Sequence, residues 1–575
     1  MKVCSQKAPL LSRGGESRRG SGGWGGAGQE NQLLTNTTPS APSTVASQHF
    51  IEGAATPPRL RRGVCVSLAV ALLSAGALAA QQNFVPEEAT IRNTQAAFAS
   101  GRATCVQVVQ AYLSRIEAYD HKGPVLNSII AVNPKALETA AEMDRLYAAN
   151  RSSSRPLHCV TVILKDNYDT ADMPTTGGSV TLAESIPRQD AFVVKKLREA
   201  GALVLAKANL MELARGGTTV SSLGGQTRNP YDLTRTPGGS SGGTGAAIAA
   251  SFAIAGTGSD TGQSVRSPAS AQSLVGLRPT RGLISRSGII PISTTQDEAG
   301  PITRTVEDAA RMLDVMAGYD PDDPITAFGA PKIPRTYTAV LDREGLKGAR
   351  IGVLTDFFGR EAVHQEVNAV TESAIRKMTE AGATMIRINM PNLDGLTRDI
   401  QVSEFETKIA FNNYLAKLGP RAPVKTLAEF IARGEFHSSL KAGLEADQRV
   451  VDGLNDPEYR NRLLRRNDLR QAVMTVMADN RLDAILYPHQ RRLVVPIGED
   501  QVDRNGVLSN STGFPAIAFP GGFSTPTNSA PIGVPVGIEL LGPDWSEPVL
   551  LKLAYAFEQA AKIRKPPAST PPLHR

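Results

Sequence analysis

The 575-residue chain contains little cysteine, only Cys4, Cys65, Cys105 and Cys159, and none of these forms a Cys-x-x-Cys pair. This scarcity excludes a disulfide-dense scaffold and gives no support to zinc or dithiol redox chemistry. Two of the four precede residue 81. The other two, Cys105 and Cys159, are either small buried apolar side chains or, in an exported chain, a disulfide pair.

The main body also lacks a strong charge of either sign. The whole chain has a formal charge of +7, from 62 Lys and Arg against 55 Asp and Glu. Residues 1–80 hold 8 basic and 3 acidic side chains, a charge of +5, so residues 81–575 carry 7 − 5 = +2. A body this close to neutral gives no electrostatic reason to expect a nucleic-acid partner.

Long apolar runs that would build a multispanning membrane protein are missing, since hydrophobic residues make up 41% and charged residues 20%. One uncharged apolar run, Val64–Ala80, follows three arginines and ends in Ala-Leu-Ala-Ala. A basic segment, a short apolar segment and small residues at a cleavage site are typical of a secretory signal. The run is marginal for a membrane anchor, which needs about 20 apolar residues. We therefore expect an exported protein, periplasmic or secreted.

The composition along the chain predicts four parts. Residues 1–58 are rich in Gly, Ser, Thr and Pro and predict a disordered extension. The signal-like segment spans 59–80, an unusual internal position, so we expect the true translation start downstream of Met1 and a mature terminus near Ala80 or Gln81. A single large domain then covers 81–570, and 571–575 is a tail.

The main body alternates helical and strand patterns. An amphipathic helix is predicted over 104–119, a strand over 159–164 that ends at Lys165, and a further strand over 202–206. Late strands are predicted at 483–487, 516–519 and 536–541, before a helix over 546–562. This order favours one α/β domain with helices on both faces of a sheet.

Two loops rich in glycine and serine carry the candidate chemistry. The first reads Thr236-Pro-Gly-Gly-Ser-Ser-Gly-Gly and leads into an Ala-rich helix that starts at Gly242 or Gly243. The second reads Asp260-Thr-Gly-Gln-Ser-Val-Arg. Neither contains the Gly-Lys-Ser/Thr of a Walker loop, and Ser264 is not in a G-x-S-x-G elbow. A single Asp-Thr-Gly lacks the second carboxylate that an aspartic protease needs.

The two loops together resemble the signature of the amidase signature family of serine hydrolases. The upstream strand that ends at Lys165 resembles the family's lysine strand. Further motifs of the family recur in order as Val275-Gly-Leu-Arg-Pro-Thr, Gln296-Asp-Glu-Ala-Gly-Pro, Thr305-Val-Glu-Asp-Ala-Ala, Thr512-Gly-Phe-Pro-Ala-Ile and Val536-Gly-Ile-Glu-Leu-Leu-Gly. The resemblance covers about 85–565 and implies a single domain around a mixed central β-sheet.

The resemblance also implies a Ser–cis-Ser–Lys triad. Carried over by motif, Lys165 is the base, Ser240 the bridging residue after a cis peptide at Gly239, and Ser264 the nucleophile. A serine hydroxyl needs a base, and lysine can serve only when neutral. Because the reference pKa of lysine is about 10.4, its ammonium must be buried among apolar neighbours to lower that pKa to about 7–8. The alternative for Lys165 is an ion pair with Asp166 at a strand end.

The turn before the nucleophile is expected to hold the oxyanion. Backbone N–H groups of Thr261, Gly262, Gln263 and Ser264 would point at the developing charge. In this sequence Gln263 replaces a glycine that is common in the family, which we expect to shape the pocket near the scissile bond. Two other residues are expected to support the loops: Ser241, which either orients its loop or simply caps the helix, and Arg266, which braces the turn.

The resemblance implies an amidase that cleaves a carboxylic amide to acid and ammonia or amine through an acyl-enzyme on Ser264. No metal, cofactor, nucleic acid or obligate protein partner is implied. Two alternatives are the glutamine-hydrolysing subunit of a tRNA-dependent amidotransferase and a non-catalytic binding protein on the same scaffold.

The resemblance implies that the substrate is chosen by the variable region of the family, here about 325–510. There Phe411, Phe430 and Phe436 either line a pocket or fill a core. The segment Asp544-Trp-Ser-Glu-Pro548 resembles bacterial peptide amidases and hints at peptide amides.

Overall fold

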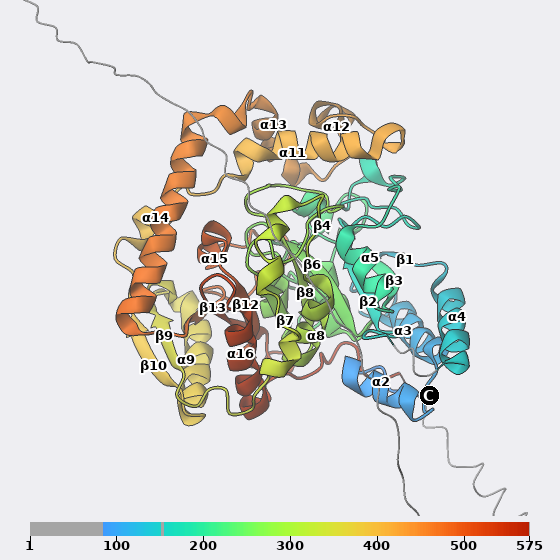
Figure 1. Cartoon of the computed structure of the whole chain (residues 1–575), viewed down its shortest axis with the longest axis horizontal. Helices are drawn as coiled ribbons and strands as arrows, with labels where there is room; N and C mark the ends of the chain where they lie inside the picture. The colour runs from blue at the N-terminus through green and yellow to red at the C-terminus, as the bar shows by residue number, and fades with distance from the viewer. Residues whose placement is uncertain (1–83, 151–154, 574–575) are drawn as a thin grey trace, which may run out of the picture. The chain divides into compact units, whose positions relative to one another are not determined.

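A mixed β-sheet of eleven strands organises the residues that the computed structural model describes, 84–150 and 155–573 (Figure 1). All of them belong to one unit that spans Ala80–Arg575. The expected extension at 1–58 and the signal-like segment at 59–80 lie outside the described residues. Across the sheet the strands follow the order β1 (Ile129–Val132), β3 (Leu203–Ala208), β2 (Thr161–Lys165), β6 (Ala255–Asp260), β8 (Glu298–Thr303), β7 (Val275–Arg278), β12 (Ala516–Phe523), β13 (Pro535–Leu541), β11 (Ala484–Pro488), β9 (Arg350–Leu354) and β10 (Thr384–Ile388).

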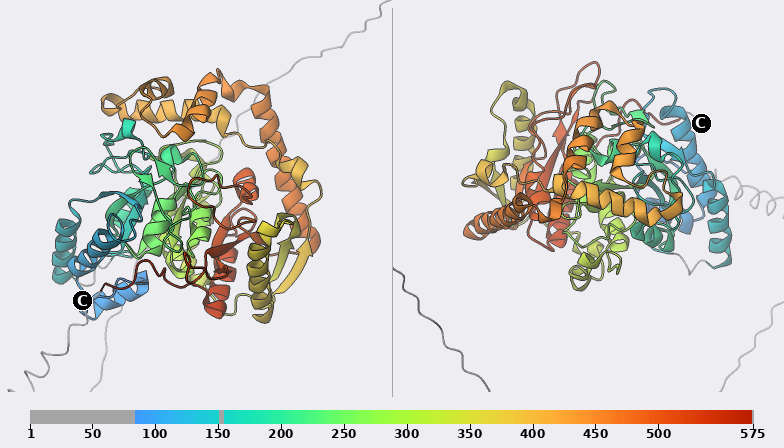
Figure 2. Two further views of the ribbon diagram at one scale, coloured as in Figure 1. Left: turned by 180° about the vertical axis from the view of Figure 1, so that it is seen from behind. Right: turned by 90° about the horizontal axis from the view of Figure 1, so that it is seen from above.

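Helices lie on both sides of this sheet, which confirms the predicted α/β class (Figures 1 and 2). The helices are α2 (Ile91–Ala99), α3 (Cys105–Tyr119), α4 (Ala136–Ala149), α5 (Phe192–Glu199), α6 (Gly242–Ala249), α7 (Arg266–Ala271), α8 (Val306–Met316), α9 (Gln365–Glu380), α10 (Leu393–Thr397), α11 (Ser403–Leu418), α12 (Leu427–Arg433), α13 (Lys441–Arg449), α14 (Pro457–Asn480), α15 (Val507–Thr512) and α16 (Glu547–Ala561). A separate short hairpin joins β4 (Val220–Ser221) and β5 (Gly225–Gln226).

The central strands are buried along their whole length, as expected for strands covered on both faces. Every residue of β2, β3 and β6 is buried. Strand β2 pairs in parallel with both β3 and β6. Because parallel neighbours end at the same edge of a sheet, the carboxyl ends of β2 and β6 meet there. The chain therefore delivers the residues that follow these two strands to one place.

The predicted amphipathic helix at 104–119 is confirmed as α3. Thr104 accepts a hydrogen bond from the Gln107 N–H while the Gln107 side chain accepts one from the Thr104 N–H, a capping box. The face that carries Val108 and Tyr112 is fully buried. The helix thus packs its apolar face into the main core.

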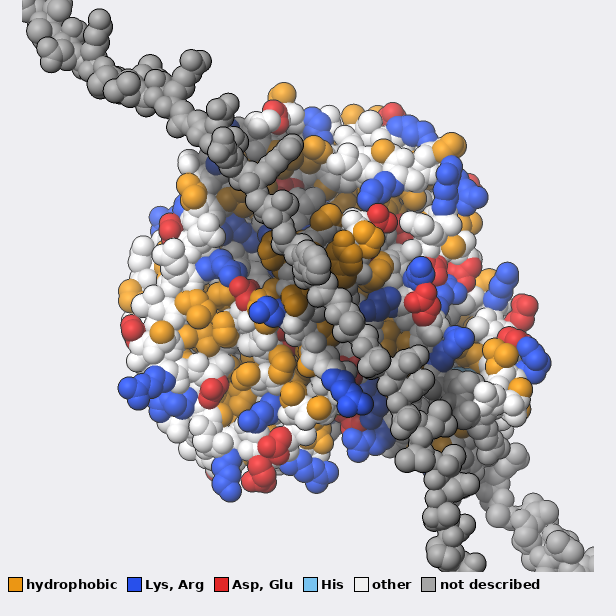
Figure 3. All heavy atoms as spheres, viewed as in Figure 1, with side chains coloured by type: hydrophobic (Ala, Val, Ile, Leu, Met, Phe, Trp, Pro, Cys, Tyr) orange, Lys and Arg blue, Asp and Glu red, His pale blue; other side chains and the backbone are white. Residues whose placement is uncertain are grey.

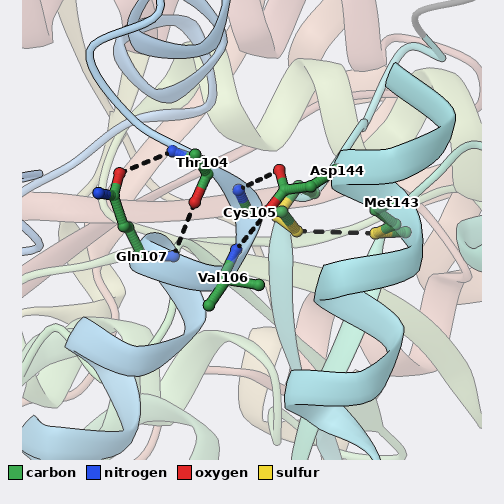
Figure 4. The surroundings of a disulfide bond; sticks show 7 residues. Thr104, Cys105, Val106, Gln107, Met143 and Asp144 are labelled. Carbon is green, nitrogen blue, oxygen red and sulfur yellow. Dashed lines mark hydrogen bonds between the residues drawn. A yellow bond between two sulfur atoms is a disulfide. The ribbon is translucent and has the colours of Figure 1, made fainter. Parts of the chain in front are cut away.

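A disulfide joins Cys105 at the start of α3 to Cys159 just before β2. Of the two roles that the sequence left open for these cysteines, the disulfide pair is therefore the correct one. Asp144 of α4 holds the same end of α3, since its carboxylate accepts hydrogen bonds from the Cys105 N–H at 2.6 Å and the Val106 N–H at 3.0 Å (Figure 4). The cross-link spans 54 positions of the chain and ties α3 to the segment that leads into the lysine strand.

The aromatic residues of the variable region fill a core. Phe411 and Phe430 are buried in a cluster built from α11, α12 and α13, where their rings meet edge to face with centroids 5.7 Å apart. Phe436 stacks on Phe430 at 5.6 Å from outside the cluster. Of the two expected roles, core filling is therefore the correct one.

The face of the molecule drawn in Figure 3 carries basic and acidic side chains interspersed with one another, in keeping with the near-neutral body. Within 84–150 and 155–573, no helix is both long and apolar enough to cross a membrane.

We expect the disulfide to stabilise the fold by restricting the unfolded chain. The double substitution Cys105→Ala and Cys159→Ala should lower the free energy of unfolding by about 2–4 kcal/mol. Denaturant unfolding without reductant measures this. Wild type unfolded with reductant serves as the control and should match the variant. Equal stability of oxidised wild type and variant would contradict the expectation.

Candidate active site

The candidate site forms where the carboxyl ends of β2 and β6 meet. Lys165 is the last residue of β2 and Asp260 the last residue of β6. The turn that follows β6 leads to Ser264 and then into α7. The Ser240 loop precedes α6, which packs on both strands. The topology therefore brings three segments, separated by up to 99 positions in sequence, to one edge of the sheet.

The Lys165 side chain is fully buried, with 0% of its surface exposed. Its Nζ donates to Ser240 Oγ at 2.7 Å and to Ser259 Oγ at 2.9 Å, and lies 3.3 Å from the Ser259 carbonyl oxygen. Burial lowers the pKa of Lys165 to about 7, against the opposing attraction of the Asp260 and Asp297 carboxylates. The amine can therefore exist in its neutral, basic form near neutral pH.

The ion pair between Lys165 and Asp166 that the sequence left open is not formed. Asp166 is turned the other way, where its carboxylate pairs with Lys207 Nζ at 3.0 Å in a fully buried contact. Adjacent residues of a strand point to opposite faces, so the two side chains separate. No carboxylate among the described residues lies within 4 Å of Lys165 Nζ.

The Ser240 loop has the backbone that the family resemblance implies, with a cis peptide between Gly239 and Ser240. A Cβ on Gly239 would lie 2.8 Å from the carbonyl carbon of Gly217, and one on Gly243 would lie 2.1 Å from the Asn209 carbonyl oxygen. Only glycine permits such close approach. The glycines of the loop are thus required for its packing against the neighbouring segments.

Ser241 does not cap α6 through its side chain, so simple capping is excluded as its role. Its hydroxyl instead reaches the Ser259 carbonyl oxygen at 3.4 Å, and its N–H donates to the Ser264 carbonyl oxygen at 3.4 Å. Ser241 therefore joins the Ser240 loop to the strand and turn that carry Ser264.

Ser264 lies beside the Ser240 loop with 8% of its surface exposed. Its hydroxyl makes no hydrogen bond to any of the described residues, so the contact between Ser240 and Ser264 that a relay needs is not formed here. Of the two hydrogen bonds in the expected series, the structure contains the one between Lys165 and Ser240. Catalytic hydrogen bonds are often long in ligand-free enzymes and tighten only with substrate.

The turn from Thr261 to Ser264 has its carbonyl groups engaged by surrounding side chains and backbone. Gly262 O accepts from Arg266 Nη2 at 2.7 Å and from Asn510 Nδ2 at 3.0 Å, and Gln263 O accepts from the Ser267 N–H at 2.7 Å. The N–H groups of Gly262, Gln263 and Ser264 find no acceptor within the described part of the chain. Because its carbonyl groups are already bonded and its N–H groups are free, this turn is suited to bind an oxyanion.

Arg266 braces the turn from a fully buried position. Its guanidinium pairs with Asp260 at 3.1 Å and with Glu539 at 2.6 Å, and also holds the Gly262 carbonyl oxygen. Burial alone would raise the pKa of Asp260, but Arg266 and Arg278 more than offset it and keep that pKa well below its usual range. The charges of this network are therefore satisfied within the protein.

Sequence reasoning missed Ser259 and Asn167. Ser259 Oγ contacts Lys165 Nζ and accepts from Asn167 Nδ2 at 2.9 Å, so it orients the amine. The sequence contained one signal for Ser259, since it directly precedes Asp260, where the second loop motif begins. Alternation along a strand puts the two side chains on opposite faces. Which face meets Lys165 depends on the pairing of β2 with β6.

A cavity of about 1020 Å³ opens next to this site. Ser259 and Thr261 form part of its wall, and Tyr414 of α11 forms another part. Tyr414 Oη donates to the Asp169 carboxylate at 2.7 Å, which ties the variable region to the loop after Lys165. The cavity is large enough for a substrate of several residues.

Comparison with known proteins identifies the family. The model of the amidase family matches residues 107–551. The native peptide amidase from Stenotrophomonas maltophilia superimposes with a TM-score of 0.75 at 36% identity, covering 84% of this chain and 98% of that one. The chain therefore belongs to the amidase signature family, whose α/β fold it shares.

Relatives of two kinds have similar identity. A probable amidase of Arabidopsis thaliana is 35% identical, covering 87% of this chain and 95% of its own. One subunit of the glutamyl-tRNA(Gln) amidotransferase of Alkaliphilus metalliredigens is also 35% identical, covering 83% of this chain and 98% of its own. Family membership and these likenesses support an amide-hydrolysing enzyme.

We expect the Lys165 amine to titrate near neutrality. In protein labelled with ¹³C and ¹⁵N at lysine, one side-chain signal should change with a midpoint at about pH 7, because burial disfavours the ammonium. The signal should be absent from a Lys165→Met variant, which assigns it. A Lys165 amine that remains protonated up to pH 10 would refute this.

Proposed function

We propose that the protein hydrolyses carboxylic amides, with Ser264 as nucleophile, Ser240 as bridge and Lys165 as base. The observation that carries this proposal is the hydrogen bond from the buried, readily neutral Lys165 amine to Ser240, in the loop beside Ser264. A serine hydroxyl that can lose its proton to such a base becomes an effective nucleophile.

In the first step Ser264 Oγ forms a bond to the carbonyl carbon of the amide. Its proton passes to Ser240 Oγ, while the Ser240 proton passes to Lys165 Nζ. The carbonyl π electrons move to oxygen, and the free N–H groups of Gly262, Gln263 and Ser264 stabilise that oxyanion. One such donor contributes roughly 10²–10³-fold to the rate in a comparable hydrolase.

In the second step the relay runs in the opposite direction. The Lys165 ammonium returns a proton through Ser240 to the leaving nitrogen, the C–N bond breaks, and ammonia or amine departs. The remaining acyl-enzyme on Ser264 is hydrolysed by water, whose proton follows the same route to Lys165. The Ser264 Oγ–C bond then breaks, the Lys165 ammonium returns that proton through Ser240 to Ser264 Oγ, and a carboxylic acid is released.

We propose primary amides at the C-terminus of short peptides as the substrate class. The similarity to a peptide amidase over 98% of that chain supports this choice. The adjacent cavity, of about 1020 Å³, supports it as well. We also propose that the chain works without a protein partner. A glutamine-hydrolysing subunit of an amidotransferase is the second candidate, because an amidotransferase subunit and a probable amidase are each 35% identical to this chain.

We expect the purified chain to release ammonia from N-acetyl dipeptide amides without tRNA, nucleotide or a second protein. Ser264→Ala should lose at least about 10³-fold in kcat/KM, since the nucleophile is gone. It should also lose labelling by a fluorophosphonate, with an unchanged circular dichroism spectrum.

The two candidates are separated by their substrates. Free glutamine serves as the competing substrate. Ammonia release from glutamine alone, or only after the other chains of an amidotransferase are added, would favour the second candidate. Full activity of Ser264→Ala would overturn the nucleophile assignment.

We further propose that the protein is exported, periplasmic or secreted. The disulfide between Cys105 and Cys159 supports this, because structural disulfides persist mainly in oxidising compartments. The signal-like segment at 59–80 is the sequence feature that would direct export.

N-terminal sequencing of protein recovered from the periplasm or medium should give a terminus near Ala80 or Gln81, because a signal peptidase cleaves after small residues. Thiol labelling of the same sample without reductant should show no free thiol at Cys105. A terminus within 1–58, or recovery only from the cytoplasm with both thiols free, would contradict the export proposal.

A further inference from the structure

Arg504 lies near both of the candidate catalytic loops. Two residues along the chain, the Gly506 N–H donates to Gln263 Oε1 at 3.2 Å, which places this segment on the turn before Ser264. On the other side, a Cβ added to Gly217 would lie 2.8 Å from Arg504 Nη1. Gly217 in turn packs against Gly239 of the cis-peptide loop.

The Arg504 guanidinium has no ionic partner in the described part of the chain: none of its nitrogens lies within 4 Å of a carboxylate oxygen, and it makes no side-chain hydrogen bond there. The neighbouring Asp503 is already shared by three other side chains, His364, Arg491 and Arg492, at 3.2 to 3.8 Å. Asp500 attracts Arg504 without contacting it.

Arg504 can be reached from solvent, although protein surrounds part of its side chain. Its side chain is exposed to solvent. Even so, the protein packed around the guanidinium lowers the pKa of Arg504, chiefly by desolvation. A side chain that is both reachable and partly desolvated makes stronger contacts with a ligand than one on a convex surface.

We propose that Arg504 binds a carboxylate of the substrate, so that the enzyme prefers amides whose acyl part carries a negative charge. The inference rests on the proposed function and adds a substrate class to it. A guanidinium presents planar pairs of N–H donors that match the two oxygens of a carboxylate. Because Gly217 has no side chain, the guanidinium can pack directly against the segment that touches the Ser240 loop.

The test compares two amides that differ in charge, N-acetyl-L-glutamic acid α-amide and N-acetyl-L-methioninamide. Wild type should have the higher kcat/KM for the anionic amide. Arg504→Gln should lower that value about 10- to 100-fold, the range for a charge-assisted hydrogen bond, mainly through KM. The loss should be confined to the anionic amide, and Arg504→Lys should restore part of it.

Arg492→Gln is the matched control, because Arg492 lies in the same segment but pairs with Asp503. It should keep the charge preference. Equal loss in Arg492→Gln, or a wild type that does not distinguish the two amides, would overturn the role of Arg504 while leaving amide hydrolysis intact.

A binding measurement separates the inference from catalysis. Titration calorimetry of N-acetyl-L-glutamic acid α-amide into Ser264→Ala should show binding that the additional Arg504→Gln change weakens about 10-fold or more. Unchanged binding would reject the inference even if hydrolysis is observed. If no amide is hydrolysed, the proposed function fails, but a charge-dependent affinity in this experiment would still support the anionic site.

Discussion

The hydrogen bond between the buried amine of Lys165 and the hydroxyl of Ser240 is the contact on which the chemistry depends. A lysine in water is almost entirely protonated at neutral pH and cannot act as a base. Here the surrounding protein removes water from the amine, and burial lowers its pKa to about 7. The same buried position places the amine against the hydroxyls of Ser240 and Ser259. Burial therefore makes the amine basic and also points it at Ser240.

The fold creates this constraint through a pair of parallel strands. Because β2 and β6 end at one edge, Lys165 and the turn before Ser264 meet without a long excursion of either loop. Glycines then let the Ser240 loop pack closer than any side chain would allow. Arg266, paired with Asp260 and Glu539, holds the turn from behind. The disulfide at Cys159 secures the segment that leads into β2. Rigid support of this kind keeps catalytic groups in position.

Two elements outside the glycine- and serine-rich loops reach the surroundings of the site. Helix α11 belongs to the variable region. It reaches the cavity through Tyr414 and is anchored by a separate aromatic core. The segment that carries Arg504 and Gly506 approaches the nucleophile turn from the other side. These two elements therefore add a phenol, Tyr414, and a cation, Arg504, to the surroundings of the site.

The sequence by itself determined the class of fold and several strands and helices, because periodicity is a local property of the chain. Lys165, Ser240 and Ser264 became candidates because short ordered motifs around them resemble those of the family. It could not decide that Ser259 faces the amine while Asp166 pairs with Lys207, that Cys105 meets Cys159, or that Arg504 is left without an ionic partner among the described residues. These outcomes depend on which strands and loops become neighbours. Only the tertiary structure fixes contacts between residues far apart in sequence, since each arises from the packing of the whole domain rather than from the residues that surround it in the chain.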